Sequence, residues 1–308
     1  MSIESVMLSL YTGRAARSML TFITLCLVAR FGYSLNDVLI GRLARKYGRM
    51  EVAAFRGVSL GGSMLPWLFF VPAAAWGALG ARALGLLAVV SVTAVANILQ
   101  LHAARHLPFG LRGALMLSTM AAGSVVIGWL ALGERSSAPE IALCVLLVGS
   151  AAATAIGTYA PAEIRIDVPR GAALTLLAAT LMSGAVFGVK QLAQATHPLL
   201  TAWAWEFGSG LILLVPALLR GTRGASDQLG TRFWTVSKAA LPTAVASGAS
   251  VLALGFGELG FWGALSGTQI LFTAALGAVW HRETLGPRRW ICMGVAVASV
   301  AGLALVRH

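Results

Sequence analysis

Apolar runs of about twenty residues recur along the whole chain and leave few folds open to it. A helix of about twenty residues is long enough to cross the ~30 Å hydrocarbon core of a bilayer. Because lipid cannot hydrogen-bond to exposed backbone groups, the spanning segments are predicted to be α-helices. Ten such helices are expected, at residues 18–40, 52–73, 84–103, 109–132, 138–158, 169–194, 199–219, 237–256, 260–281 and 288–306.

The composition excludes a soluble globular protein. Of the 308 residues, 58% are hydrophobic and 11% are charged, whereas about 25% of residues are charged in a typical soluble domain. The chain is therefore predicted to be an all-α integral membrane protein that crosses the bilayer many times, with membrane lipids as its surroundings.

The net charge of +12 would suggest a nucleic-acid partner in a soluble protein, but its distribution here argues against one. The basic residues gather in the short gaps between apolar runs, as Arg42, Arg45, Lys46 and Arg49 do. Lysine and arginine at such positions meet anionic lipid headgroups. We expect no nucleic acid among the partners of this protein.

The cysteine pattern indicates neither a disulfide framework nor a metal site. Cys26, Cys144 and Cys292 lie in separate apolar runs, and no CxxC or Cys/His spacing typical of metal ligands occurs. We expect no bound metal and no cofactor.

The chain divides into two similar halves at the connection between residues 158 and 169. A shift of about 150 residues matches residues at equivalent places in the two halves: Pro66 with Pro216, Thr119 with Thr268, Gly128 with Gly277, and Glu134 with Glu283. The predicted repeats are residues 1–160 and 161–308. Five crossings per repeat is an odd number, so the second repeat is expected to be inverted relative to the first, around a central cavity.

Each repeat places a glutamate after its fourth predicted helix, in Gly133-Glu134-Arg135 and in Arg282-Glu283-Thr284. With two tandem five-helix units, this arrangement resembles the EamA-type branch of the drug/metabolite transporter superfamily. The resemblance implies a non-enzymatic secondary carrier working by alternating access. It further implies an exporter of a small amphipathic metabolite, such as an amino acid, in the bacterial inner membrane. Such a carrier is expected to function as a monomer or homodimer.

Charged residues inside the apolar runs are the first candidates for substrate binding, since a charge at the bilayer centre costs about 2.5 to 3.5 kcal/mol on insertion scales. Arg30, Ser34 and Asp37 share one helix face, with Asn36 beside them. Each half also holds one acid and one base in its first two helices, with the signs exchanged. The crossed pairs Asp37 with Lys190 and Arg56 with Glu206 are therefore predicted. Such charges either line the substrate cavity or form buried ion pairs that fix helix register.

Uncharged polar and aromatic residues complete the expected cavity. Asn97 and Gln100 share a face of the third predicted helix, and Gln269 lies in the equivalent region of the second half. Trp203 lies beside Glu206. The candidate substrate-binding residues are Arg30, Ser34, Asn36, Asp37, Arg56, Asn97, Gln100, Lys190, Trp203, Glu206 and Gln269. Among them, Asp37 and Glu206 are the candidate carriers of a coupling proton.

The glutamates after the fourth helix of each repeat are expected to have structural functions. Glu134 and Glu283 lie in short turns, where they are predicted to cap a helix or to pair with Arg135 and Arg282.

Two other classes of function stay open. The segment Gly57-Val58-Ser59-Leu60-Gly61 matches GxSxG, so a membrane protease could pair Ser59 with His102. A lipid-modifying enzyme would have Asp37, His102 and Glu206 as its acid and base groups. A channel or a membrane scaffold is the other class.

Overall fold

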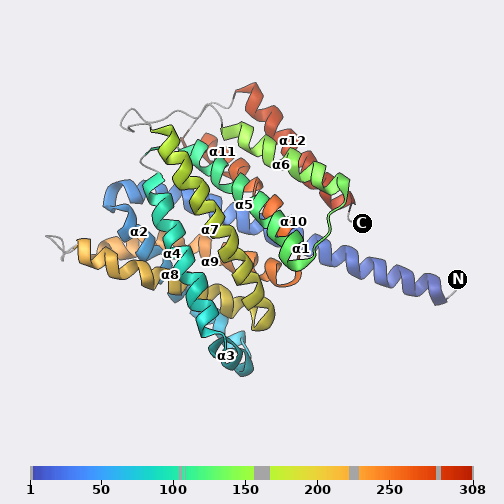
Figure 1. The fold of residues 1–308 in the computed structure, drawn as a ribbon, viewed down its shortest axis with the longest axis horizontal. Helices are drawn as coiled ribbons and strands as arrows, with labels where there is room; N and C mark the ends of the chain where they lie inside the picture. The colour runs from blue at the N-terminus through green and yellow to red at the C-terminus, as the bar shows by residue number, and fades with distance from the viewer. Residues whose placement is uncertain are drawn as a thin grey trace.

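The structure, a computed structural model, describes residues 3–103, 106–107, 109–155, 167–221, 229–281 and 286–306 (Figure 1). Within these ranges the regular elements are helices, and no strand occurs. In chain order they are α1 (Ile3–Tyr47), α2 (Arg49–Met64), the 3₁₀ helix η1 (Leu65–Phe70), α3 (Ala73–Gly80), α4 (Ala83–Ala103), α5 (Phe109–Leu132), α6 (Ala138–Ala155), α7 (Val168–Ala195), α8 (Pro198–Gly221), α9 (Leu229–Phe256), α10 (Leu259–Leu265), α11 (Thr268–His281) and α12 (Pro287–Val306).

The predicted all-helical membrane fold is confirmed. Six segments within the described ranges are long and apolar enough to cross a membrane, namely Met19–Ile40, Ala83–Ala103, Leu115–Leu132, Val168–Ala195, Pro198–Leu219 and Leu229–Phe256. Two shorter apolar helices occur at Ala138–Ser150 and Trp290–Leu303. The arrangement of ten crossings in two inverted repeats stays a prediction, and the boundary between the repeats lies outside the described residues.

Two of the predicted helices are interrupted. The run 52–73 contains α2 and η1, and the chain is extended at Val71 and Pro72 before α3 begins. Pro66 and Pro72 lack the backbone N–H that a continuous helix needs, which explains the change there. The run 260–281 is divided into α10 and α11 at Ser266 and Gly267, both of which are buried. Non-helical backbone at membrane depth is tolerated where protein covers it.

Helix packing joins the first part of the chain to the second almost everywhere. The helix α1 packs along α9 and also contacts α11, while α4 packs along α7. The helix α2 packs along α8, and α6 lies beside α12, as Figure 1 shows at the upper right. A further contact joins α5 to α7 and to α10.

The helices α2 and α8 approach closely at paired glycines. A Cβ atom built on Gly57 would lie 2.5 Å from the Cα atom of Gly210, and one built on Gly210 would lie 2.7 Å from the Cα atom of Gly57. Glycine is therefore required on both sides of this contact, as in the small-residue crossings of membrane helices.

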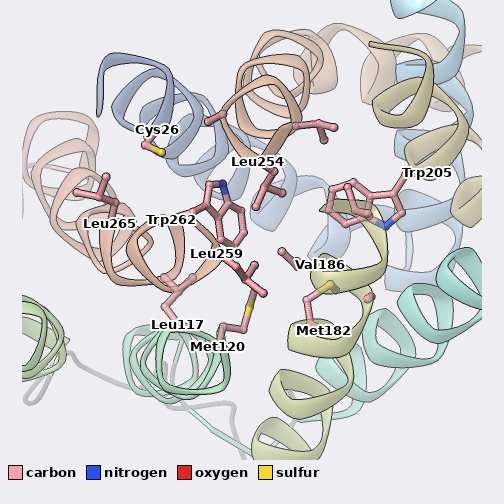
Figure 2. Packing of buried hydrophobic residues seen from close by; sticks show 14 of the residues in the cluster. Cys26, Leu117, Met120, Met182, Val186, Trp205, Leu254, Leu259, Trp262 and Leu265 are labelled. Atoms are coloured by element: carbon pink, nitrogen blue, oxygen red, sulfur yellow. The ribbon is translucent and has the colours of Figure 1, made fainter. Parts of the chain in front are cut away.

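A hydrophobic cluster fills the space where α1, α5, α7, α9 and α10 meet (Figure 2). Trp262 of α10 lies at its centre with 2% of its surface exposed, and Cys26 of α1, Met120 of α5 and Val186 of α7 surround it. This packing places α10 between α1 and α5, and thereby fixes the position of the break between α10 and α11.

Candidate substrate site

A carboxylate at the contact of the two parts of the chain organises the first polar cluster. Glu206 of α8 is 6% exposed, and its Oε2 atom lies 3.8 Å from Nη2 of Arg56 on α2. The hydroxyl of Ser247, on α9, donates a 2.9 Å hydrogen bond to Oε1 of Glu206. Tyr33 of α1 lies close enough to Ser247 and Glu206 to interact with both. Four helices thus meet at one carboxylate, and the predicted pair of Arg56 with Glu206 is confirmed.

A second cluster joins α1 to the break before α11. The amide nitrogen of Gln269 donates a 2.9 Å hydrogen bond to Oδ2 of Asp37, and Asn36 lies in hydrogen-bond range of the same carboxylate. The hydroxyl of Ser34 donates to the backbone carbonyl of Gln269 at 2.8 Å and to that of Arg30. Two of the predicted residues of α1, Ser34 and Asp37, therefore attach this helix to α11 through Gln269.

The predicted pair of Asp37 with Lys190 is wrong. Nζ of Lys190 lies 2.9 Å from Oε1 of Glu134, in the turn between α5 and α6, and it also donates to the carbonyl of Gly257 at 2.6 Å. The backbone N–H groups of Leu259 and Gly260 donate to the same carboxylate at 2.7 and 2.9 Å. We call the cluster of Glu134, Lys190 and the start of α10 the latch. Lys190 is bound by Glu134 of this latch and not by Asp37.

Glu134 caps a helix and forms an ion pair, as expected, but its partner is not the expected Arg135. Its carboxylate caps a helix, namely α10, and it pairs with Lys190 and not with Arg135, which is exposed. The first N–H groups of a helix have no partner within it and carry partial positive charge, so a carboxylate is favoured there. The equivalent Glu283 and its neighbour Arg282 lie outside the described residues.

Acid is expected to weaken the latch. Burial opposes ionisation of Glu134, but the hydrogen bonds from Gly260, Leu259 and Lys190 outweigh it and lower the pKa of this carboxyl below 4.5. The latch therefore contributes its full stability above the pKa of the unfolded chain, near 4.5, and loses it as pH falls further, through the folded pKa. We expect the melting temperature of the detergent-solubilised protein to decrease as the pH is lowered below 4.5. In Glu134→Gln this decrease should be smaller.

The same variant should lower the melting midpoint at neutral pH, because hydrogen bonds to a charged group contribute about 2 kcal/mol. Glu51→Gln is the matched control, since it removes an equal charge from a more exposed ion pair with Arg232, at 3.5 Å. Equal losses in the two variants would contradict the assignment of the latch.

The remaining predicted residues have local partners. Trp203 donates from Nε1 to the carbonyl of Gly61 at 3.1 Å and stacks on Phe207, which places it on the contact of α2 with α8. Nε2 of Gln100 contacts Sδ of Met116 at 3.5 Å. Asn97 is half-buried on α4. The structure does not bring Gln100 and Gln269 together in a hydrogen bond.

Arg30 differs from Arg56 and Lys190, which pair with carboxylates, because its guanidinium lies against an aromatic ring. Its guanidinium carbon lies 4.1 Å from the ring centre of Trp262, and the residue is 3% exposed. Trp262 in turn donates from Nε1 to the hydroxyl of Ser250 at 3.2 Å. Sequence reasoning missed Tyr33, Ser247 and Trp262, because nothing in a single sequence shows which helix faces meet.

The two residues of the protease-like pattern are not joined. The hydroxyl of Ser59 donates to the carbonyl of Phe55 at 2.6 Å and lies 2.6 Å from the hydroxyl of Ser237. His102 is exposed on α4. The geometry of Ser59 is that of a helix-packing serine. Among the described residues, no group of three His, Cys, Asp or Glu is placed to hold a metal ion.

A separate pocket of about 430 Å³ lies between α5, α6 and α10, and Glu140 is the charged residue in its lining. Its lining is almost wholly apolar, and it includes Val126, Ile141 and Val145, which are also exposed on the surface of the bundle. This pocket belongs to the face that meets lipid.

The fold and its buried charges define a multi-pass helical membrane protein with polar groups at the contact of its two parts. Residues 169–305 match the profile of the EamA-like transporter family. This match bears out, over the second part of the chain, the predicted resemblance to the EamA-type branch of the drug/metabolite transporter superfamily. The family consists of membrane transporters, which agrees with the expectation of a non-enzymatic function.

A solved structure, described only as a crystal structure of a protein, is similar to this chain with a TM-score of 0.70 at 13% identity. The similarity covers 95% of this chain and 97% of the other, so the two share a fold. No curated protein matches the sequence significantly.

Proposed function

We propose that this protein is a secondary carrier that exports a small amphipathic metabolite, such as an amino acid, across the bacterial inner membrane. The observation that carries the proposal is the Glu206 cluster, in which α1 and α2 contact α8 and α9 through ionisable groups buried at membrane depth. Such groups are expensive to bury and mark substrate or ion pathways in membrane proteins.

The helix contacts support alternating access between two inverted repeats, residues 1–160 and 161–308. If the two halves exchange places, α1 replaces α7 and α9 replaces α4, so the contact of α1 with α9 becomes that of α7 with α4. The same exchange swaps α2 with α8 and α6 with α12, so the contact within each of these two pairs is preserved. A bundle with this property can adopt two related conformations of similar free energy, with a site at the interface open to alternate sides.

In this proposal the substrate-binding residues are the polar groups of α1 together with Arg56, Asn97, Gln100, Trp203, Glu206 and Gln269, and Lys190 acts through the latch. Asp37 and Glu206 are the candidate proton carriers. The protein functions as a monomer or a homodimer surrounded by lipid.

Counterflow tests this proposal directly. Purified protein is reconstituted into liposomes loaded with a pooled metabolite mixture, and exchange is followed by mass spectrometry. Saturable exchange of a few compounds is the expected result, and it should require the protein. Arg82→Gln is a suitable control, since Arg82 is exposed and its side chain donates to the carbonyl of Ala78, one turn earlier in the chain.

The alternatives give different results in the same assay. A channel would conduct without saturation or counterflow, and a membrane enzyme would change the mass of a compound instead of its location. A folded sample that exchanges nothing under an imposed proton gradient, or in its absence, would refute the proposed carrier function.

A further inference from the structure

We infer that Arg30 binds the anionic group of the substrate, and that the substrate class is small organic carboxylates with an apolar body. This inference rests on the proposed carrier function and assigns its substrate chemistry. It starts from an unusual combination of features: the guanidinium of Arg30 is buried, lies at the middle of its membrane span and forms no ion pair with a described residue.

The position of Arg30 rules out escape of its charge to a membrane surface. The residue lies at the middle of the span Met19–Ile40. A rise of 1.5 Å per residue puts it roughly 15 Å from either end of that span, beyond the reach of an arginine side chain. Its charge must therefore be stabilised within the bundle.

The hydrogen-bonding state of Arg30 indicates what is missing. Its Nε and Nη2 atoms are buried and have no hydrogen-bond partner among the residues that the structure describes. These two nitrogens form one edge of the guanidinium, and their N–H bonds point in parallel. A carboxylate accepts two parallel hydrogen bonds from this edge, and this is the strongest geometry available to an arginine.

The acids of the described interior are already engaged. Glu206 lies against Arg56 and accepts from Ser247, Asp37 accepts from Gln269, and Glu134 binds Lys190 and the start of α10. Asp37 is held by a neutral amide, so these three acids and the bases Arg56, Lys190 and Arg30 are equal in number. What Arg30 lacks among the described residues is a hydrogen-bond acceptor at Nε and Nη2. Buried polar groups are normally hydrogen-bonded, so this open edge points to an acceptor on a ligand.

The surroundings of Arg30 favour an organic anion over an inorganic one. The face of the Trp262 ring covers the guanidinium at 4.1 Å, and Tyr33 lies 5.9 Å away, measured to its ring centre. Trp262 belongs to the main hydrophobic cluster, as Figure 2 shows, so the anion is next to apolar side chains. The open edge supplies two donors in an apolar setting, which suits the two oxygens of a monocarboxylate and would leave the second charge of a phosphate dianion unpaired.

Ligand chemistry provides the test. Unliganded protein in detergent is mixed with monocarboxylates from acetate to 3-phenylpropanoate, each paired with its neutral amide, and binding is measured by calorimetry and by the melting midpoint. We expect at least one carboxylate to bind at least tenfold more tightly than its amide. Equal binding of acid and amide, or binding of neither, would overturn the inference.

Variants of Arg30 then locate the site. Arg30→Gln should weaken carboxylate binding at least tenfold and leave any weak amide binding unchanged. Arg30→Lys keeps the charge but loses the parallel donors, so it should retain an intermediate affinity. If Arg30→Gln does not fold, Arg30→Lys and the wild-type acid–amide comparison still decide the question. If Arg30→Lys and Arg30→Gln both bind carboxylates as tightly as the wild type, Arg30 is not the binding residue. Arg82→Gln is the matched control and should bind as wild type does.

Failure of this inference is distinguishable from failure of the carrier function. Counterflow restricted to cations or neutral compounds would support a carrier and overturn the carboxylate class. Carboxylate binding lost in Arg30→Gln, without transport of any compound by the wild type, would support the site and refute the carrier.

Discussion

Replacing Gly57 by valine should separate α2 from α8 and lower the stability of the protein by about 3 kcal/mol, the upper range for overpacking of a tight interior. The new Cβ atom would lie 2.5 Å from the Cα atom of Gly210 and 2.9 Å from its nitrogen. Both atoms belong to the backbone, so no side-chain rotation can relieve the clash. The measurement is the melting midpoint in detergent, with gel filtration to report the folded fraction.

A second glycine of the same helix provides the control. A Cβ atom at Gly62 would meet nothing within 4 Å, and this residue is exposed. Gly62→Val should therefore leave the free energy of unfolding within about 1 kcal/mol of wild type, since only the intrinsic helix propensity changes. Similar losses at positions 57 and 62 would show that the close contact of α2 with α8 is not a determinant of stability.

Neutralising Glu206 should abolish transport, by at least a hundredfold, with a smaller effect on folding. Glu206→Gln keeps an acceptor for the hydroxyl of Ser247 but leaves Arg56 without its carboxylate. Removing one partner of a buried pair typically costs about 3 to 5 kcal/mol. Because 21% of the Arg56 side chain is exposed, water can replace part of the lost interaction and the loss should be at the lower end. Counterflow and the melting midpoint are measured on the same preparation.

The double variant Arg56→Gln/Glu206→Gln separates a pathway from a structural pair. We expect it to recover most of the lost stability, since no unpaired charge remains, and to stay inactive. Recovery of transport together with stability would show that the pair only fixes helix register. Glu51→Gln, which removes a charge in the first turn of α2, is the control and should transport normally.

Hydrophobicity alone was enough to locate nearly all the helical segments, because a membrane span needs a continuous apolar run whatever it packs against. The prediction failed where the backbone changes direction inside such a run, at Pro72 and at Ser266 with Gly267. Proline was visible in the sequence as a cause of the first break. The second break depends on the burial of α10 between α1 and α5, which no local pattern reports.

The charged pairs also show that a sequence does not reveal which residues meet in the folded chain. A shift of 150 residues makes Arg56 equivalent to Glu206, and these residues are in contact because α2 packs along α8. The argument did not extend to Lys190, which is offset by one helical turn from the position equivalent to Asp37. Its partner comes from a turn that folds back over α10, and turns follow no helical periodicity.

Trp262 was invisible to sequence reasoning for a related reason. One tryptophan among nine in an apolar chain carries no signal of its own, and its importance comes from lying against Arg30. Only a structure identifies the one tryptophan ring that shields this charge.

The latch has a consequence for the kinetics of the protein. One carboxylate holds Lys190 of α7 and the first two backbone N–H groups of α10, so α7 cannot move away from α10 without breaking several charge-assisted bonds at once. A step that breaks them together has a large activation enthalpy and a steep dependence on temperature. If this movement belongs to the working cycle, turnover should slow sharply on cooling, and weakening Glu134 should flatten that dependence.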